Sequence, residues 1–187
     1  KLSMAQTNWV ISELKKVNSD CEYEIKPITT KGDTDTRPLF TIEQKGIFEK
    51  EIDKAVAAKE IDFAVHSLKD VPSELADNLI IASIPKREKV NDVFISSDDS
   101  SLDKIKPGSV IGTSSLRRAV QISRQRSDVT VKPIRGNIET RINKTSGENY
   151  DAIVLAQAGI SRLGVDVNFT PLSVDDFSPS PVQGAIA

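Results

Sequence analysis

Arginine side chains gather in one stretch of the chain, close to segments that predict strand-to-helix turns. Residues 117–144 hold eight basic residues against two acidic ones, although the 187-residue chain has a formal net charge of −2. A locally positive field in an acidic protein favours an anionic ligand. Charge alone fits a solvated basic surface equally well, so the positions of the arginines have to decide.

The segment 112–118, with the sequence GTSSLRR, directly follows a short apolar run that predicts a strand. Thr113 or Ser114 is a suitable helix N-cap at this point. Helix N-termini attract anions through their unpaired N–H groups and the macrodipole, and Arg117 and Arg118 add planar guanidinium groups that grip carboxylates. The segment therefore favours an anion site, and a plain N-cap followed by two solvent-facing arginines is the alternative.

Residues 135–141 repeat this arrangement after the next predicted strand. Gly136 permits a tight turn, and Arg141 lies about one helical turn further on. Ligands of open α/β sheets bind beyond the carboxyl ends of the strands, so two such segments would direct four arginines into one cleft. A turn glycine with surface arginines remains the alternative. The small residues at 156–159 fit helix-to-sheet packing better than ligand contact, and Arg162 one turn later is ambiguous.

The segment 65–72, with the sequence VHSLKDVP, leaves a further predicted strand in the first half of the chain. A carboxylate at a strand end, such as Asp70, suits acid–base work or the holding of positive charge, and an ion pair with Lys69 is equally open. His66 is the only histidine and is interpreted as a packed, hydrogen-bonded residue. One histidine and one cysteine, Cys21, far apart in the sequence do not make a typical zinc site.

Hydrophobic periodicity predicts alternating helices and strands, and therefore an α/β fold with mainly parallel sheets. In the first half we expect helices over residues 2–14 and 47–56, a long loop over 29–45, and strands over 23–28, 61–65 and 79–84. In the second half we expect helices over 115–126, 138–144 and 156–163, and strands over 92–95, 109–111, 129–134 and 151–155. A crossover at 85–91 would separate domain 1 (1–86 plus 178–187) from domain 2 (87–177).

Composition narrows the classes of protein to consider. Hydrophobic residues make up 38% and charged residues 28%, as in ordinary globular proteins. No apolar run approaches the ~20 residues that cross a bilayer, and no signal peptide is visible, so we expect no membrane partner. A lone cysteine favours a cytoplasmic location. Aromatic residues amount to only 5%, which argues against RNA stacking on the arginine stretch, and we expect no nucleic-acid partner.

Taken together and in order, these motifs resemble the porphobilinogen deaminase family. The resemblance covers essentially the whole chain and rests on residues 30–33, 45–48, 66–72, 112–118, 135–137, 140–141, 155–159 and 162–164. It implies two periplasmic-binding-protein-like (type II) domains with a hinge between them. The family's third domain, of α+β type, is expected to be absent from this sequence, as is a first strand before residue 1.

The resemblance implies a transferase of porphyrin and haem biosynthesis, a hydroxymethylbilane synthase. Such enzymes condense four porphobilinogen units, with loss of ammonia, into a linear tetrapyrrole that grows on a covalent dipyrromethane cofactor. The family carries this cofactor on a cysteine of the third domain, so we expect these residues alone to be inactive. Family members are usually monomers, and a monomer is expected here.

The resemblance also implies the roles of individual residues. Asp70 matches the catalytic aspartate. The arginines that match binders of substrate and cofactor carboxylates are Arg117, Arg118, Arg135, Arg141 and Arg162. Supporting positions are Lys45, Ser67, Lys69, Thr113, Ser114, Ser115, Gly136, Asn137, Ala156 and Gln183. The alternative is a two-lobed module that binds a small carboxylate without chemistry, which would have no need of a carboxylate such as Asp70 facing its ligand.

Overall fold

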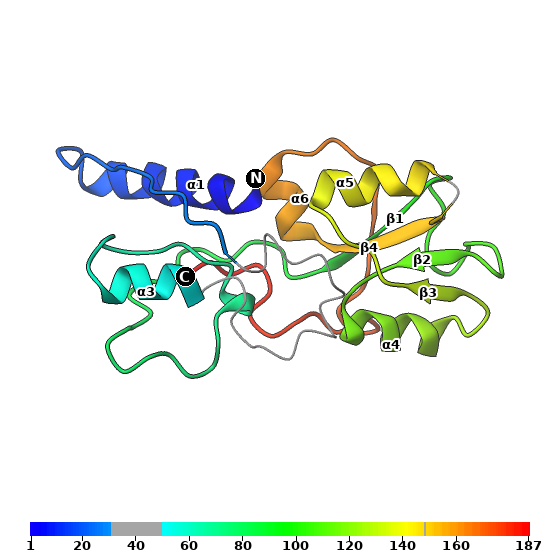
Figure 1. The fold of residues 1–187 in the computed structure, drawn as a ribbon. Helices are drawn as coiled ribbons and strands as arrows, with labels where there is room; N and C mark the ends of the chain where they lie inside the picture. Colours follow the sequence, from blue (N-terminus) through cyan, green and yellow to red (C-terminus); the bar gives the residue numbers. More distant parts are fainter. Residues whose placement is uncertain (31–49, 148) are drawn as a thin grey trace. The chain divides into compact units, whose positions relative to one another are not determined.

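The computed structural model describes residues 1–30, 50–147 and 149–187 (Figure 1). These residues fall into two compact units. Unit 1 comprises residues 1–30, 50–88 and 185–187, and unit 2 comprises residues 89–184. None of the helices in the described ranges is both long and apolar enough to cross a membrane.

Unit 2 is built on one five-stranded sheet in the order β3-β2-β4-β1-β5. Its strands are β1 (Asp92–Ser96), β2 (Val110–Gly112), β3 (Thr130–Lys132), β4 (Ala152–Ala156) and β5 (Thr170–Pro171). β2 pairs in parallel with β3 and β4, whereas β1 pairs antiparallel with β4 and β5. Four strands therefore run in one direction and β1 opposes them. The prediction of an α/β fold with a mainly parallel sheet is confirmed for this unit.

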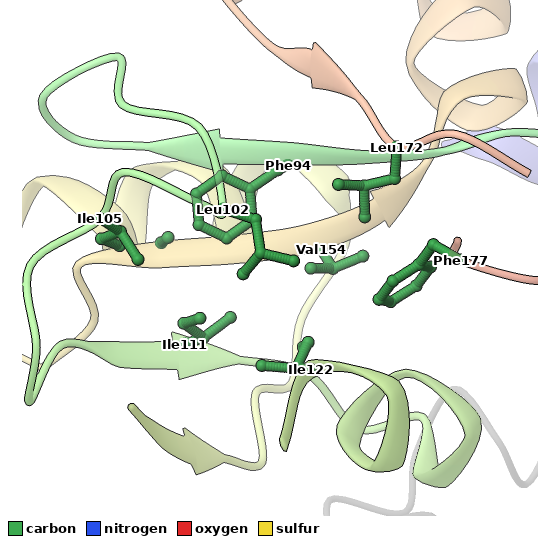
Figure 2. Close-up of a cluster of buried hydrophobic side chains, with 9 residues drawn as sticks. Phe94, Leu102, Ile105, Ile111, Ile122, Val154, Leu172 and Phe177 are labelled. Carbon is green, nitrogen blue, oxygen red and sulfur yellow. The ribbon is translucent and has the colours of Figure 1, made fainter. Parts of the chain in front are cut away.

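Both faces of the sheet are covered by helices, α4 (Leu116–Gln125) on one side and α5 (Ile138–Asn143) with α6 (Gln157–Leu163) on the other (Figure 1). A short 3₁₀ turn, η3 (Lys144–Ser146), extends α5. Successive residues of β4 pack alternately into the two layers, because side chains of a strand alternate between faces. Val154 joins Phe94 and Ile122 of α4 (Figure 2), whereas Ile153 joins Ile160 of α6.

The predicted helices and strands of this unit are confirmed, with ends shifted by at most two residues. β3 ends before Pro133, which has no N–H group to continue the ladder. The sequence predicts β1 and β4 clearly because both strands are buried, β1 at every position and β4 at all but its last. Continuous apolar runs of this length between turns are typical of sheets covered on both faces.

Unit 1 contains α1 (Leu2–Val17), α3 (Lys50–Ala57) and a 3₁₀ turn, η2 (Leu68–Asp70). The predicted strands at 23–28, 61–65 and 79–84 are wrong: the only pairing outside helices in the described part of this unit is one antiparallel bridge, Ser67 with Ile186. Short apolar runs need a pairing partner to become strands, and several side chains in these runs face solvent, with Ile80 84% exposed. The predicted loop at 29–45 lies largely outside the described residues.

The units differ from the predicted domains in where the chain passes back from the second unit to the first. The first crossing, between residues 88 and 89, lies inside the predicted crossover, but residues 178–184 belong to unit 2 and not to unit 1. Helix α4 holds this segment by its backbone: Gln121 accepts a hydrogen bond from the Ser178 N–H (2.6 Å) and donates to its carbonyl (3.1 Å). One turn further along the helix, Gln125 donates to the Asp176 carbonyl (2.7 Å).

Shortening Ile122 tests the contribution of the α4 layer to the core. Ile122 is fully buried, whereas Val120 on the same helix is 58% exposed. We expect Ile122→Ala to lower the free energy of unfolding by about 2–5 kcal/mol, through lost burial and a residual cavity. The matched Val120→Ala change should stay within about 0.5 kcal/mol. Urea titration of the full-length protein measures both, and equal effects would contradict the packing described.

Candidate functional site

The three hydroxyl groups in the turn between β2 and α4 all form hydrogen bonds to nearby backbone groups. Ser115 caps α4, its Oγ accepting from the Arg118 N–H at 3.4 Å, so the prediction of Thr113 or Ser114 as the cap is wrong. Ser114 instead bridges to the neighbouring chain: its Oγ donates to the Ile134 carbonyl (2.6 Å) and accepts from the Ile134 N–H (3.2 Å). Thr113 Oγ1 accepts from the Ser115 N–H at 3.2 Å. These bonds fix the start of the helix that carries the two arginines.

Arg117 and Arg118 converge on one carboxylate, that of Asp92 at the first position of β1. The Asp92 side chain is fully buried, and its Oδ1 accepts from Arg118 Nε (3.1 Å) and Nη2 (2.6 Å). Arg118 Nη1 also donates to the Val154 carbonyl of β4 (3.1 Å). Arg117 Nη2 lies 2.8 Å from Asp92 Oδ2 as an ion pair, while its Nη1 donates to the Ser178 carbonyl. Arg118 is therefore a buried residue, and Arg117 is partly exposed.

Two opposing influences act on the Asp92 carboxyl. Burial by itself raises its pKa, but Arg118, Gln183 and Arg117 together outweigh this, and the pKa lies below the usual value for aspartate. Gln183 contributes through Nε2, which donates to Asp92 Oδ1 at 2.9 Å and to the Val90 carbonyl at 2.7 Å. Asp92 is thus ionised at neutral pH despite its burial.

The turn between β3 and α5 is built by three adjacent residues. Asn137 caps α5, its Oδ1 accepting from the Thr140 N–H and hydroxyl at 2.9 Å each. Gly136 has a φ of +121°, and a Cβ there would lie 2.7 Å from Thr140 Cγ2, so the turn requires glycine. Arg141 Nε donates back to the Gly136 carbonyl at 2.6 Å. The prediction that Gly136 permits a tight turn is confirmed, and Asn137 serves as the helix cap.

The arginines of the two turns lie close enough to influence one another. Burial, followed by the positive charges of Arg118 and Arg135, lowers the pKa of the Arg141 guanidinium. Like charges are held near each other only when the surrounding structure fixes them or an anion compensates them. The strand ends of β2 and β3 therefore create a concentrated positive field that suits a ligand with several carboxylates.

The remaining predicted residues of unit 2 have structural contacts. Ala156 ends β4 and precedes α6 as its N-cap residue, without a side-chain cap bond. Arg162 on α6 donates through Nη2 to the Gly184 carbonyl at 2.6 Å. Gln183, 1% exposed, contacts Asp92 as described above. Arg162 and Gln183 thus both hold the segment on which the chain leaves this unit.

In unit 1, the segment that carries Asp70 is fixed by the end of the chain. The backbones of His66 and Ala187 exchange two hydrogen bonds (2.8 and 2.9 Å), and the Leu68 N–H donates to the Ala185 carbonyl (3.1 Å). Ser67 Oγ accepts from Gln6 Nε2 of α1 at 2.8 Å. The 3₁₀ turn η2 then places Lys69 and Asp70 at the surface of the unit.

The Asp70 carboxyl holds its proton more tightly than an ordinary aspartate does. Desolvation by surrounding protein raises its pKa, and the charges of Lys69 and His66 oppose the rise without cancelling it. Its side chain still reaches solvent, so the raised pKa belongs to a group accessible to a ligand. His66 Nε2 lies 3.7 Å from Asp53 Oδ1, and burial lowers the histidine pKa. This placement supports a packed role for His66.

The sequence indicated the arginines but did not indicate the residue that organises two of them. Asp92 has a weak signal, a single acid at the start of the otherwise apolar run DVFIS, 26 positions before Arg118. Within the described ranges the structure brings Arg118, Arg135 and Arg141 near one another and joins Arg117 to Arg118 through Asp92. Lys45 lies outside the residues that the structure describes.

Comparison with known proteins identifies the family to which the chain is similar. A family model described as "Porphobilinogen deaminase, dipyromethane cofactor binding domain" matches residues 1–187. The chain is 82% identical over 187 residues to a probable porphobilinogen deaminase of Nitrosopumilus maritimus (strain SCM1) and 50% identical over 193 residues to the porphobilinogen deaminase of Listeria innocua. It is also 50% identical over 190 residues to that of Bacillus velezensis. These alignments include all of this chain and 60%, 62% and 61% of the respective relatives.

The fold defines a two-unit α/β protein with a group of arginines at the strand ends of its second unit. The family match identifies it further: the chain belongs to the porphobilinogen deaminase family, whose matched domain binds the dipyrromethane cofactor. The three relatives above carry the name porphobilinogen deaminase, one of them as probable. The chain spans about three fifths of the length of those relatives.

Replacing Gly136 tests the turn that positions Arg141. We expect Gly136→Ala to lower the free energy of unfolding by about 1–3 kcal/mol, because a side chain is strained at this φ and collides with Thr140. Gly147→Ala is the control, since Gly147 has a φ of −113° and its added Cβ would meet nothing closer than 3.8 Å. Thermal unfolding of the two variants compares them. A Gly136 variant as stable as the Gly147 variant would show that the turn does not depend on glycine.

Proposed function

We propose that this protein is a hydroxymethylbilane synthase, which condenses four porphobilinogen units into a linear tetrapyrrole with release of ammonia. The proposal is supported by the family membership and by the closeness of three arginines: burial, followed by the charges of Arg118 and Arg135, lowers the pKa of Arg141. Porphobilinogen carries two carboxylates, so a growing oligopyrrole adds two negative charges per unit. A fixed group of arginines is the expected complement of such a ligand.

The same arginines fit the dipyrromethane cofactor, which is itself a polycarboxylate. Arg117, Arg118, Arg135 and Arg141 would hold its carboxylates, with Arg162 and the supporting polar residues of the strand ends around them. When bound, the cofactor supplies the pyrrole carbon to which the first substrate is joined. Cys21 is exposed after α1 in unit 1, and we propose that the thioether is made at another cysteine. Residues 1–187 by themselves would then not sustain turnover.

Asp70 is proposed as the catalytic carboxylate. Departure of ammonia from porphobilinogen requires a proton and leaves positive charge on the electron-rich pyrrole. A carboxyl with a raised pKa donates or accepts that proton more readily than an ordinary aspartate, and in its ionised form it stabilises the positive charge. Lys69, whose charge opposes the rise, and Ser67 are proposed as supporting residues.

We propose that the two units are lobes of the periplasmic-binding-protein (type II) kind. The support is the sheet of unit 2, in which the strand order β3-β2-β4-β1-β5 places one opposing strand, β1, among four that share a direction. The polar turns that follow β2 and β3 lie at their carboxyl ends, where ligands of such sheets bind. A monomer in the cytoplasm is proposed for the whole protein.

Removing the Asp70 carboxylate tests its catalytic role. In the full-length protein, Asp70→Asn should lower kcat/KM by about 10²–10⁴-fold while leaving the fold intact, because the amide neither transfers the proton nor carries charge. Asp77→Asn, an exposed change seven residues later, is the control. If the ionised carboxylate is the active form, wild-type activity should fall as pH drops through the pKa of Asp70, which is raised above the usual value for aspartate. Near-normal turnover by Asp70→Asn would refute the assignment.

Neutralising Arg141 tests the carboxylate site. We expect Arg141→Gln to raise KM for porphobilinogen by roughly tenfold or more, the equivalent of one lost charge-assisted hydrogen bond. Arg124→Gln serves as the control, because Arg124 lies exposed on α4, away from the turns. Steady-state kinetics at fixed ionic strength measure both variants. Equal KM values would remove Arg141 from the binding site.

A further inference from the structure

We propose that Asp92 is a positioning residue, which fixes Arg117 and Arg118 in the orientation that binds the carboxylates of the ligand. The inference rests on the proposed function and adds to it a residue that itself contacts no ligand. Asp92 is fully buried at the start of β1 and lies within 2.8 Å of both guanidinium groups. It acts on the ligand only through those two side chains.

Helix geometry makes a shared partner necessary. Successive residues of an α-helix point about 100° apart, so Arg117 and Arg118 on α4 would diverge without a common contact. Their charges would also repel each other, and the charge of Arg118 already acts on Arg141. The two oxygens of one carboxylate bring both groups to the same place, Oδ1 holding Arg118 and Oδ2 lying beside Arg117.

The two arginines are held with different firmness. Arg118 is 7% exposed and uses Nε, Nη1 and Nη2 in bonds to Asp92 and Val154, which leaves its guanidinium plane no freedom to rotate. Arg117 is more exposed, and its contact with Asp92 Oδ2 is an ion pair without hydrogen-bond angles. The Arg118 side chain is thus held rigidly, whereas the Arg117 side chain has more freedom to move, and both are held by Asp92.

Asp92 also connects the arginines with the segment on which the chain leaves unit 2. Gln183, one residue before the end of this unit, donates to the same Oδ1 that holds Arg118. The carboxylate therefore has partners from α4 and from residue 183, two elements far apart in the sequence. Loss of its charge would weaken the hold on all three side chains at once.

Kinetics of an isosteric variant provide the first test. In the full-length protein, Asp92→Asn should raise KM for porphobilinogen roughly tenfold or more, with a smaller change in kcat, because the amide keeps the shape but loses the charge that holds the arginines. Asp128→Asn is the control, since Asp128 forms an ion pair with Arg126 at 2.8 Å in the same unit. A folded Asp92→Asn protein with wild-type KM would overturn the proposal.

A double-mutant cycle separates positioning from a general structural role. If Asp92 acts through Arg117, adding Asp92→Asn to Arg117→Gln should raise KM by much less than it does alone. Purely additive effects of the two changes would contradict action through Arg117.

Chemical labelling tests the proposal without turnover. Phenylglyoxal modifies accessible guanidinium groups, and peptide mass spectrometry reads the rate at Arg117 in the protein without substrate. We expect this rate to rise roughly tenfold in Asp92→Asn, as for one lost charge-assisted contact, while the rate at Arg124 stays unchanged. Equal rates at Arg117 in variant and wild type would refute the role of Asp92. Absence of tetrapyrrole product from the wild type would instead refute the proposed function alone.

A second variant covers the case in which Asp92→Asn does not fold. Combining Asp92→Asn with Arg118→Met removes both buried charges, a change that proteins often tolerate when neither partner is left alone. Arg117 should react faster with phenylglyoxal in this double variant as well. An unchanged rate at Arg117 in the folded double variant would also overturn the proposal.

Discussion

One ionised carboxylate without access to water holds the arginine side of unit 2 together. A buried charge costs several kcal/mol unless its partners replace the lost hydration. Asp92 obtains them from Arg118, Arg117 and Gln183. Arg118 in turn bonds to the backbone of β4 through the Val154 carbonyl. Arg118 therefore links Asp92 directly to the centre of the sheet, so a change at either residue affects both.

The rest of unit 2 serves this arrangement by keeping its polar groups at strand ends. β1 and β4 are buried between two apolar layers, and the turns after β2 and β3 carry the arginines. Ser114 fastens the first turn to the second through both backbone groups of Ile134. These two hydrogen bonds between the Ser114 side chain and the Ile134 backbone tie together the turns that carry the arginines.

Much of unit 2 could be predicted from the sequence, because β1 and β4 are buried, largely apolar runs bounded by turn residues; β5, only two residues long, was not predicted. The N-cap of α4 could not be, since three successive hydroxyl residues offer equal local propensity and the contact of Ser114 with Ile134 decides among them. Asp92 gave too little signal because its partners lie 25 and 26 positions away. The strands expected in unit 1 failed for a related reason: pairing is a property of neighbours, and short runs such as 61–65 do not specify one.

Helix α4 recognises residues 176–178 through main-chain atoms, the carbonyl of Asp176 and both backbone groups of Ser178. Natural selection can therefore alter the identities of those two residues without breaking the attachment, provided the chain keeps its path and residue 178 keeps an N–H group. The restriction falls instead on Gln121, whose amide must both donate and accept, so that even glutamate at this position would lose half of the contact. Related chains should accordingly vary widely at residues 176 and 178 and little at residue 121.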